Sequence, residues 1–257
     1  MIAELHGKIS GTGSNLHDRL EDQLTGDIFG SLRYLPYGLG IAPILLAAKV
    51  PASVVEKGAP EVWIDRITFW PREELGELDV RIDLDDAVIG IEVKYQSDLS
   101  SDDGADYSGV TGEEAERVSA HQLSRESRIV QAWAGARKKA FLILVARDSE
   151  CARIVSDVTA RNLIAAGVEL RAVSWQEILL VLEKQQSSDL VFSRILEDMA
   201  ALLKRKKFER FHGFDSALPA VCAGGFFPYQ YKQNPGPQLP REPIVDGGTY
   251  YEFGRKC

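Results

Sequence analysis

The chain has 257 residues, of which 45% are hydrophobic and 26% are charged, and its formal net charge is -8. These values are ordinary for one globular domain with a modest appendage, and no apolar run reaches the roughly 18–20 residues of a membrane helix. The N-terminus lacks a basic segment followed by an apolar one, so we expect no signal peptide. The three cysteines, Cys151, Cys222 and Cys257, are far apart, which predicts neither a zinc site nor a disulfide framework and favours a cytoplasmic protein without a membrane partner.

The acidic net charge argues against a protein that binds nucleic acid through its total charge. The local charge differs, because basic residues gather between 117 and 139 and again at 204–207. Many acidic residues lie elsewhere, around 98–106. Any contact with nucleic acid is therefore expected to be local.

Two helix candidates begin the chain. Leucine or isoleucine recurs every four residues over 15–32, which predicts a helix with one apolar face and with Asn15 as its N-cap. A shorter helix is expected at 41–49.

Three strand candidates follow these helices. Apolar and polar residues alternate over 61–70 and over 77–84, which predicts two strands. The nearly continuous apolar run at 87–95 predicts a more buried strand, and Asp85-Asp86 between the last two strands predicts a hairpin. In the strand at 77–84, four apolar side chains are expected on one face: Leu78, Val80, Ile82 and Leu84.

The second half of the chain alternates helices with strands after a polar loop at 96–112. Ser174 and Glu177 have the spacing of a capping box, which predicts the start of a helix that runs to about 184. Gly167 is expected to end the helix before it. The other expected elements are helices over 113–136, 155–166 and 190–208 and strands over 141–145 and 168–173.

This order predicts an α/β fold in which a mixed β-sheet is flanked by α-helices. A core domain is expected over residues 1–186. Residues 187–257 are expected to add a C-terminal helix and an aromatic, Pro/Gly-rich tail that packs on the core.

Charged residues interrupt the two hairpin strands. Glu92 and Lys94 lie two residues apart on a strand and therefore face the same side, and Asp79 on the neighbouring strand can share that side. Burying such charges without partners is costly. Two nearby carboxylates repel each other, a divalent cation relieves that repulsion, and a lysine can orient a water or stabilise charge at a phosphate.

These residues resemble the PD-(D/E)XK nuclease superfamily, in which an Asp precedes an apolar strand that ends in Glu-x-Lys. Leu78 stands where the superfamily name has proline, a position that often departs from it. The resemblance implies a restriction-endonuclease-like core. It also implies that Asp79, Glu92 and the carbonyl of Val93 bind Mg²⁺ or Mn²⁺, and that Lys94 orients the attacking water.

Two further residues extend this resemblance. Many members carry an acidic residue in the first helix that joins the metal site, and Glu21 is the candidate here, with a solvated acidic patch as the alternative. Gln122 lies on the apolar stripe of the helix over 113–136 and needs a polar partner. The segment 121–126 is similar to the motif of recombination- and helicase-linked nucleases, in which a Gln faces the catalytic site, although Glu126 replaces the usual tyrosine. A buried structural role for Gln122 is the alternative.

The same segment resembles nuclease-like proteins of bacterial phage-defence systems. Arg125 and Arg128 are expected to bind substrate, and Arg125 could instead pair with Glu126. The resulting hypothesis is a metal-dependent endonuclease that hydrolyses DNA as an effector of anti-phage defence, with RNA not excluded. The alternative is a silent or partner-gated nuclease-like module that binds nucleic acid or a partner protein. A second copy of the chain or a defence-system protein is the expected partner.

Overall fold

The computed structural model describes residues 16–57, 63–95 and 121–210. The strands are β1 Ile67–Phe69, β2 Arg72–Glu73, β3 Gly76–Glu77, β4 Val80–Asp83, β5 Ala87–Val93, β6 Lys139–Ala146 and β7 Val168–Ser174. The helices are α2 Leu16–Leu32, α3 Ile41–Ala47, α4 Ala52–Lys57, the 3-10 turn η1 Ile64–Arg66, α5 Gln122–Ala134, α6 Asp148–Ala160, α7 Trp175–Lys184 and α8 Leu190–Arg205.

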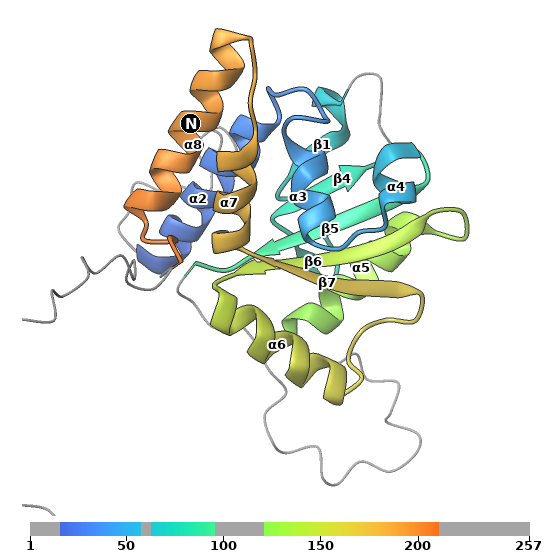
Figure 1. Cartoon of the computed structure of the whole chain (residues 1–257). Coiled ribbons are helices and arrows are strands. Elements are labelled where there is room, and N and C mark those ends of the chain that lie inside the picture. The colour runs from blue at the N-terminus through green and yellow to red at the C-terminus, as the bar shows by residue number, and fades with distance from the viewer. Residues whose placement is uncertain (1–15, 58–62, 96–120, 211–257) are drawn as a thin grey trace, which may run out of the picture. The chain divides into compact units, whose positions relative to one another are not determined.

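A mixed sheet with the strand order β1-β4-β5-β6-β7 forms the centre of the fold (Figure 1). The first three of these strands are antiparallel neighbours, and β5, β6 and β7 run parallel. The expected α/β architecture, a mixed sheet flanked by helices, is therefore confirmed. β5 lies in the middle of the sheet, and all seven of its residues are buried.

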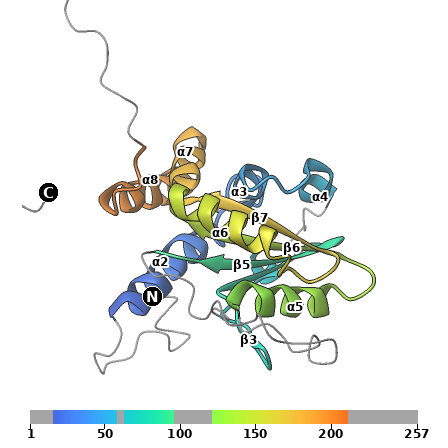
Figure 2. The same ribbon diagram turned by 90° about the horizontal axis from the view of Figure 1, so that it is seen from below.

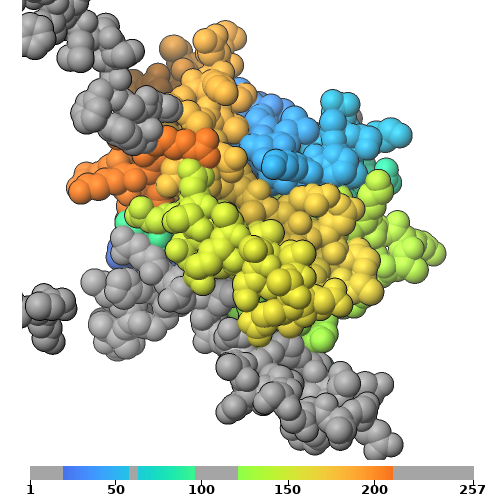
Figure 3. Space-filling model, turned by 60° about the horizontal axis from the view of Figure 1, so that its bottom comes forward, coloured from blue at the N-terminus to red at the C-terminus, as the bar shows by residue number. Residues whose placement is uncertain are grey.

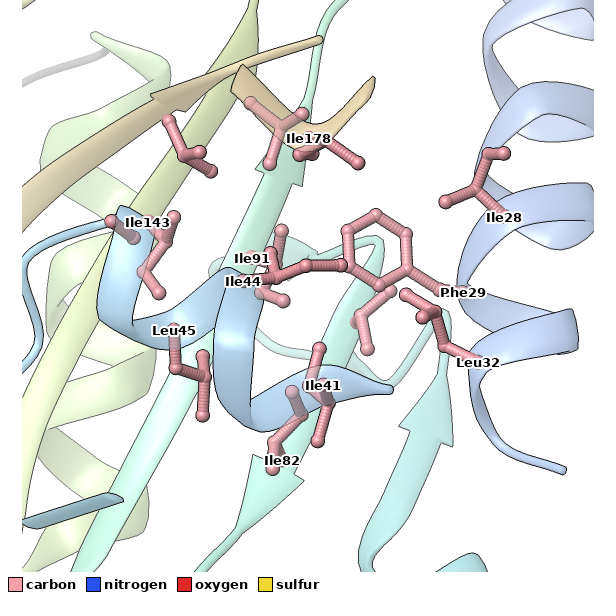
Figure 4. Close-up of a cluster of buried hydrophobic side chains, with 14 of the residues drawn as sticks. Ile28, Phe29, Leu32, Ile41, Ile44, Leu45, Ile82, Ile91, Ile143 and Ile178 are labelled. Atoms are coloured by element: carbon pink, nitrogen blue, oxygen red, sulfur yellow. The ribbon is translucent and has the colours of Figure 1, made fainter. Parts of the chain in front are cut away.

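Helices cover both faces of the sheet, and the sheet separates two apolar cores. In Figure 2, α5 lies on one side of the strands and α3 and α4 lie on the other. The larger core contains α2, α3, α4, α7 and α8, and Figure 4 shows Phe29 of α2 close to side chains of α3 and the sheet. The smaller core contains α5 and α6. The surface of α6, yellow-green in Figure 3, continues into the yellow surface of β7.

The last helix contributes to the larger core through Leu196, Met199 and Leu203. The proposed domain boundary at residue 186 stays a prediction, and the aromatic tail lies outside the described residues. None of the helices in the described ranges is long and apolar enough to cross a membrane.

Several local predictions are confirmed. The strands over 77–84 and 87–95 form an antiparallel hairpin around Asp85-Asp86, as β4 and β5. The capping box opens α7: the Ser174 hydroxyl accepts from the Glu177 amide, and the Glu177 carboxylate accepts from the Ser174 amide. The loop at 96–112, residues 113–120 and Asn15 lie outside the described residues. The helix expected over 113–136 is shorter in the described part, because His121 is a non-helical N-cap and α5 covers only Gln122–Ala134.

Other predictions are wrong. The strand expected at 61–70 is shorter, because a 3-10 turn occupies Ile64–Arg66 and β1 covers only Ile67–Phe69. The helix expected at 155–166 begins earlier, at Asp148, where acidic residues favour a first turn. It also ends earlier, at Ala160, and the backbone at Asn162 has a positive φ of 52°. Gly167 therefore does not end a helix, since it precedes β7 with a φ of 79°.

The single apolar face expected for the strand at 77–84 is also wrong. Val80, Ile82 and Leu84 belong to the larger core, whereas Leu78 belongs to the smaller one. The cause is that residues 76–77 form β3, which pairs with β2 in a separate two-stranded sheet. The chain redirects between that sheet and β4, so the alternation of faces does not continue through Leu78.

Candidate active site

The strand register brings the two predicted carboxylates together. Val80 of β4 pairs with Ile91 of β5, so the next positions along the same register are Asp79 and Glu92. Residues opposite each other in an antiparallel pair have their side chains on the same face. That face carries α5, because the residue that precedes Glu92 on it, Gly90, contacts Val130 of α5. Asp79 is 9% exposed and Glu92 is 3% exposed.

A backbone hydrogen bond fixes the orientation of Asp79. Its Oδ2 accepts from the amide of Val93 at 2.8 Å. The amide of Trp70 in turn donates to the carbonyl of Asp79 at 2.9 Å, which holds the start of β4. The Asp79 carboxylate is therefore held at the end of β5, one residue from Glu92.

Lys94 joins the carboxylates of two elements. Its ammonium Nζ lies 2.8 Å from Oε1 of Glu92 and 3.2 Å from Oε1 of Glu21 on α2. The second oxygen of Glu21 accepts from the amide of Tyr95 at 2.9 Å. Lys94 is only 6% exposed, so both ion pairs are partly or fully removed from water. The structure thus places Glu21 beside the predicted triad, not in a solvated patch.

Hydrogen bonds with β6 and α7 hold the backbone of Lys94. Its amide donates to the carbonyl of Val145 on β6 at 2.7 Å, and its carbonyl accepts from the indole of Trp175 at 2.9 Å. Trp175 stacks on Phe208, with ring centroids 5.6 Å apart. The segment after α8 thereby supports the strand end that carries the lysine.

Gln122 lies at the start of α5 and reaches the same site. Its Nε2 donates to Oε1 of Glu92 at 2.5 Å, and the side chain is 8% exposed. The close approach of α5 to β5 depends on Gly90, because a Cβ there would meet Cγ2 of Val130 at 2.4 Å. Gln122 therefore has the polar partner that its burial requires, and that partner is a predicted catalytic carboxylate.

Glu126 is a site residue that the sequence analysis did not assign. It lies one helical turn after Gln122, so both side chains share one face of α5. It is 3% exposed, and Gln122 donates a hydrogen bond to its carboxylate. The spacing of four from Gln122 was the available signal. It was outweighed by the neighbouring Arg125, which suggested a surface ion pair.

The electrostatics reflect several buried carboxylates around one lysine. Burial raises the pKa of Asp79 well above its usual value, and the charge of Glu92 raises it further. Burial also raises the pKa of Glu126, again helped by Glu92. Burial alone would lower the pKa of Lys94, but Glu92, Glu21 and Asp79 outweigh it and raise that pKa. The site therefore holds a firmly charged ammonium and an excess of acidic groups.

The two predicted substrate-binding arginines lie further along α5. Nε of Arg125 donates to the carbonyl of Leu75, between β2 and β3, at 3.2 Å. Nη1 of Arg128 is buried without a hydrogen-bond partner among the described residues. The hydrogen bonds and ion pairs described above link four predicted residues to one another: Glu21, Glu92, Lys94 and Gln122. Asp79 joins them through its hydrogen bond from the amide of Val93, the residue after Glu92.

The donor set is compatible with a divalent cation. Mg²⁺ is commonly held by one or two carboxylates, with waters and substrate phosphates completing its ligands. Asp79 and Glu92 supply two carboxylates whose mutual repulsion a cation would relieve, and the carbonyl of Val93 directly follows Glu92 in the chain. Within 16–57, 63–95 and 121–210, no group of three or more His, Cys, Asp or Glu residues is already arranged to hold a metal ion. The pair would therefore need further oxygen ligands.

Comparisons with known proteins give no relative: no family model, no curated protein and no solved structure matches the chain. Arguments about its function therefore depend on the residues of the site, on their geometry and on the sequence resemblance that they carry.

Proposed function

We propose that the chain is a metal-dependent nuclease that hydrolyses phosphodiester bonds of DNA. One observation carries the proposal: Asp79 and Glu92 meet on one face of adjacent strands, with the Lys94 ammonium 2.8 Å from Glu92. The three side chains are at most 9% exposed. Keeping these charges buried has a substantial free-energy cost, and a function of the charges accounts for it better than stability does.

The resemblance to PD-(D/E)XK nucleases supports this proposal and implies a restriction-endonuclease-like fold. The order of elements agrees with that core, because a helix precedes β1, β4 and β5, and α5 and β6 follow. Glu21 and Gln122 also contact the triad from the two helices in which the resemblance expects additional site residues. The proposed role in anti-phage defence depends on the resemblance alone.

Each residue has a role in this proposal. Asp79, Glu92 and the Val93 carbonyl would hold Mg²⁺ or Mn²⁺, which supplies a Lewis acid that polarises the phosphate and acidifies a water. Lys94 has three N–H donors, and its contacts with Glu92 and Glu21 leave one for the attacking water. Glu21 fixes the lysine and the backbone of Tyr95. Gln122 orients Glu92, and Arg128, whose Nη1 has no hydrogen-bond partner among the described residues, would contact a phosphate.

The second candidate is a nuclease-like module that binds nucleic acid or a partner without cutting, or that cuts only once a partner binds. The complete set of two carboxylates and a lysine favours catalysis, since a module that only binds has no need of all three. A gated nuclease is compatible with the same residues, and it would bind the metal before the partner is present.

A cleavage assay tests the proposal. Linear, circular and single-stranded DNA and RNA would be incubated with Mg²⁺ or Mn²⁺ and with wild type, Asp79→Asn or Glu92→Gln. We expect metal-dependent cleavage of DNA by wild type and its loss in both variants, which change charge but little shape. The matched control is Glu197→Gln, because Glu197 is a solvent-exposed residue of α8. Cleavage that persists in folded Asp79→Asn and Glu92→Gln would contradict the proposal.

A further inference from the structure

The carboxylate of Glu126 is buried beside the proposed site with half of its bonding capacity unused. The side chain is 3% exposed, and its Oε2 has no hydrogen-bond partner. An apolar residue of similar length could fill this space on α5 without that cost.

The surroundings of Glu126 are acidic. Glu92 and Asp79 both act on its carboxylate with unfavourable like charges, and Lys94 provides the opposing charge. The Lys94 ammonium already contacts Glu21 and Glu92. Its positive charge is therefore shared among several carboxylates, and an additional cation would stabilise the cluster.

The amide of Gln122 lies between Glu92 and Glu126. Its nitrogen donates to Oε1 of Glu92, and the same side chain hydrogen-bonds Glu126. The contacts of Glu92 with Lys94 and Gln122 both use Oε1, and no donor of the described residues is bonded to its Oε2. Each of the two carboxylates that Gln122 contacts thus has one oxygen, Oε2, without a donor among the described residues.

We infer that Glu126 is a metal-binding residue, and that it and Glu92 form a second divalent-cation position on the α5 side of the site. The position is separate from the one between Asp79 and the Val93 carbonyl. Rotation of the Gln122 amide would turn its oxygen toward the cation and add a third oxygen ligand, a donor type that Mg²⁺ and Ca²⁺ sites use. This inference depends on the proposed metal-dependent function, and it adds a residue that the resemblance does not supply.

The contacts of Gln122 explain why the carboxylates of Glu92 and Glu126 do not converge on one position in the metal-free chain. Without a cation, the amide nitrogen of Gln122 separates the two carboxylates by donating to both. A bound cation would offset the repulsion between the two carboxylates, so that they no longer need the amide between them. A pair of cations that share Glu92 is the arrangement by which two-metal sites stabilise both the attacking and the leaving oxygen of a phosphodiester.

The test counts bound ions directly. Free Mn²⁺ would be measured by electron paramagnetic resonance during titration of the whole chain without nucleic acid. We expect about two Mn²⁺ ions per wild-type chain and about one per Glu126→Gln chain. Glu126→Gln keeps the size of the side chain and an oxygen that can accept from Gln122. Glu197→Gln is the control and should bind as many ions as wild type.

A second variant protects the test against misfolding. Glu126→Met replaces the carboxylate by an apolar chain of similar length, and circular dichroism would verify that either variant is folded. Equal Mn²⁺ numbers and affinities in wild type and in the folded variants would overturn the inference, while the proposed function would stand. If the wild-type chain bound no Mn²⁺, the proposed metal-dependent function would fail together with the inference.

Discussion

Replacing Gly90 with alanine tests how closely α5 must approach β5 to form the site. The new Cβ would lie 2.4 Å from Cγ2 of Val130 and 3.0 Å from Cδ2 of Leu78. Carbon atoms in contact are about 3.5–4.0 Å apart, so the first distance is too short by about 1 Å. Valine in a helix has one strongly preferred rotamer, so Val130 cannot turn away without cost. The helix or the strand must therefore move.

The expected loss follows from overpacking of a dense core. We expect Gly90→Ala to lower the free energy of unfolding by about 1–3 kcal/mol. A shift of α5 also lengthens the contact from Gln122 to Glu92, which is 2.5 Å in the native chain. Any cleavage activity should therefore fall more than the fraction of folded protein does.

Removing the obstructing methyl groups should relieve this cost. Val130→Ala alone should cost about 2 kcal/mol, from two buried methyl groups and the cavity they leave. The double variant should be about as stable as Val130→Ala, which corresponds to a favourable coupling of about 1–3 kcal/mol, the whole cost of Gly90→Ala. Urea denaturation at constant slope measures all three free energies.

The control is Gly38→Ala, where a Cβ would meet nothing within 4 Å. Its free energy of unfolding should stay within about 0.5 kcal/mol of wild type. The reasoning is refuted if Gly90→Ala is as stable as wild type, or if Val130→Ala does not relieve its cost.

Three further predictions concern single groups. Ser174→Ala should lower the free energy of unfolding by about 1 kcal/mol in urea, because it removes the acceptor for the Glu177 amide at the start of α7; an unchanged value would contradict the cap. In metal-free protein, Asp79 holds its proton more tightly when folded, so stability should fall as pH rises above 3.8, and this contribution should vanish in Asp79→Asn. Parallel stability profiles of the two proteins would refute the burial of that charge. Burial raises the pKa of Cys151 from 9.0 to about 11, which lowers the fraction of reactive thiolate at pH 8. In a chain whose other two cysteines are replaced by serine, alkylation of folded protein at pH 8 should therefore be slower than alkylation of unfolded protein by about 100-fold or more.

The sequence was sufficient to predict which charged residues of the two hairpin strands lie together in the site. Alternation along a strand put Glu92 and Lys94 on one side, and the short Asp85-Asp86 turn fixed a register in which Asp79 faces Glu92. Both depend on local geometry that a short segment determines. The Ser174 cap could be predicted for the same reason.

Features that depend on distant contacts could not be predicted in this way. Leu78 points into the smaller core because β3 pairs with β2, and the two-residue strands leave no periodic pattern. The burial of Glu126 depends on how closely α5 packs on β5, which Gly90 controls from another element. A glutamate between an arginine and a serine is typical of an exposed helix face, so the sequence favoured the wrong environment.

The role of Gln122 required both kinds of information. Its position on an apolar stripe indicated a buried amide that needs a partner, but the stripe does not identify that partner. Only the packing of α5 over Gly90 brings its nitrogen to Glu92. Glu21 is similar, because its contact with Lys94 joins residues 73 positions apart.

The most direct test of the central claim is Mg²⁺-dependent cleavage of DNA by Lys94→Met compared with wild type. The variant keeps the aliphatic chain but removes the ammonium that contacts Glu92 and Glu21. We predict that wild type cleaves and that the folded variant, with unchanged circular dichroism, is slower by about 100-fold or more, the effect expected when a group that stabilises the transition state is lost. Full activity in folded Lys94→Met would contradict the account.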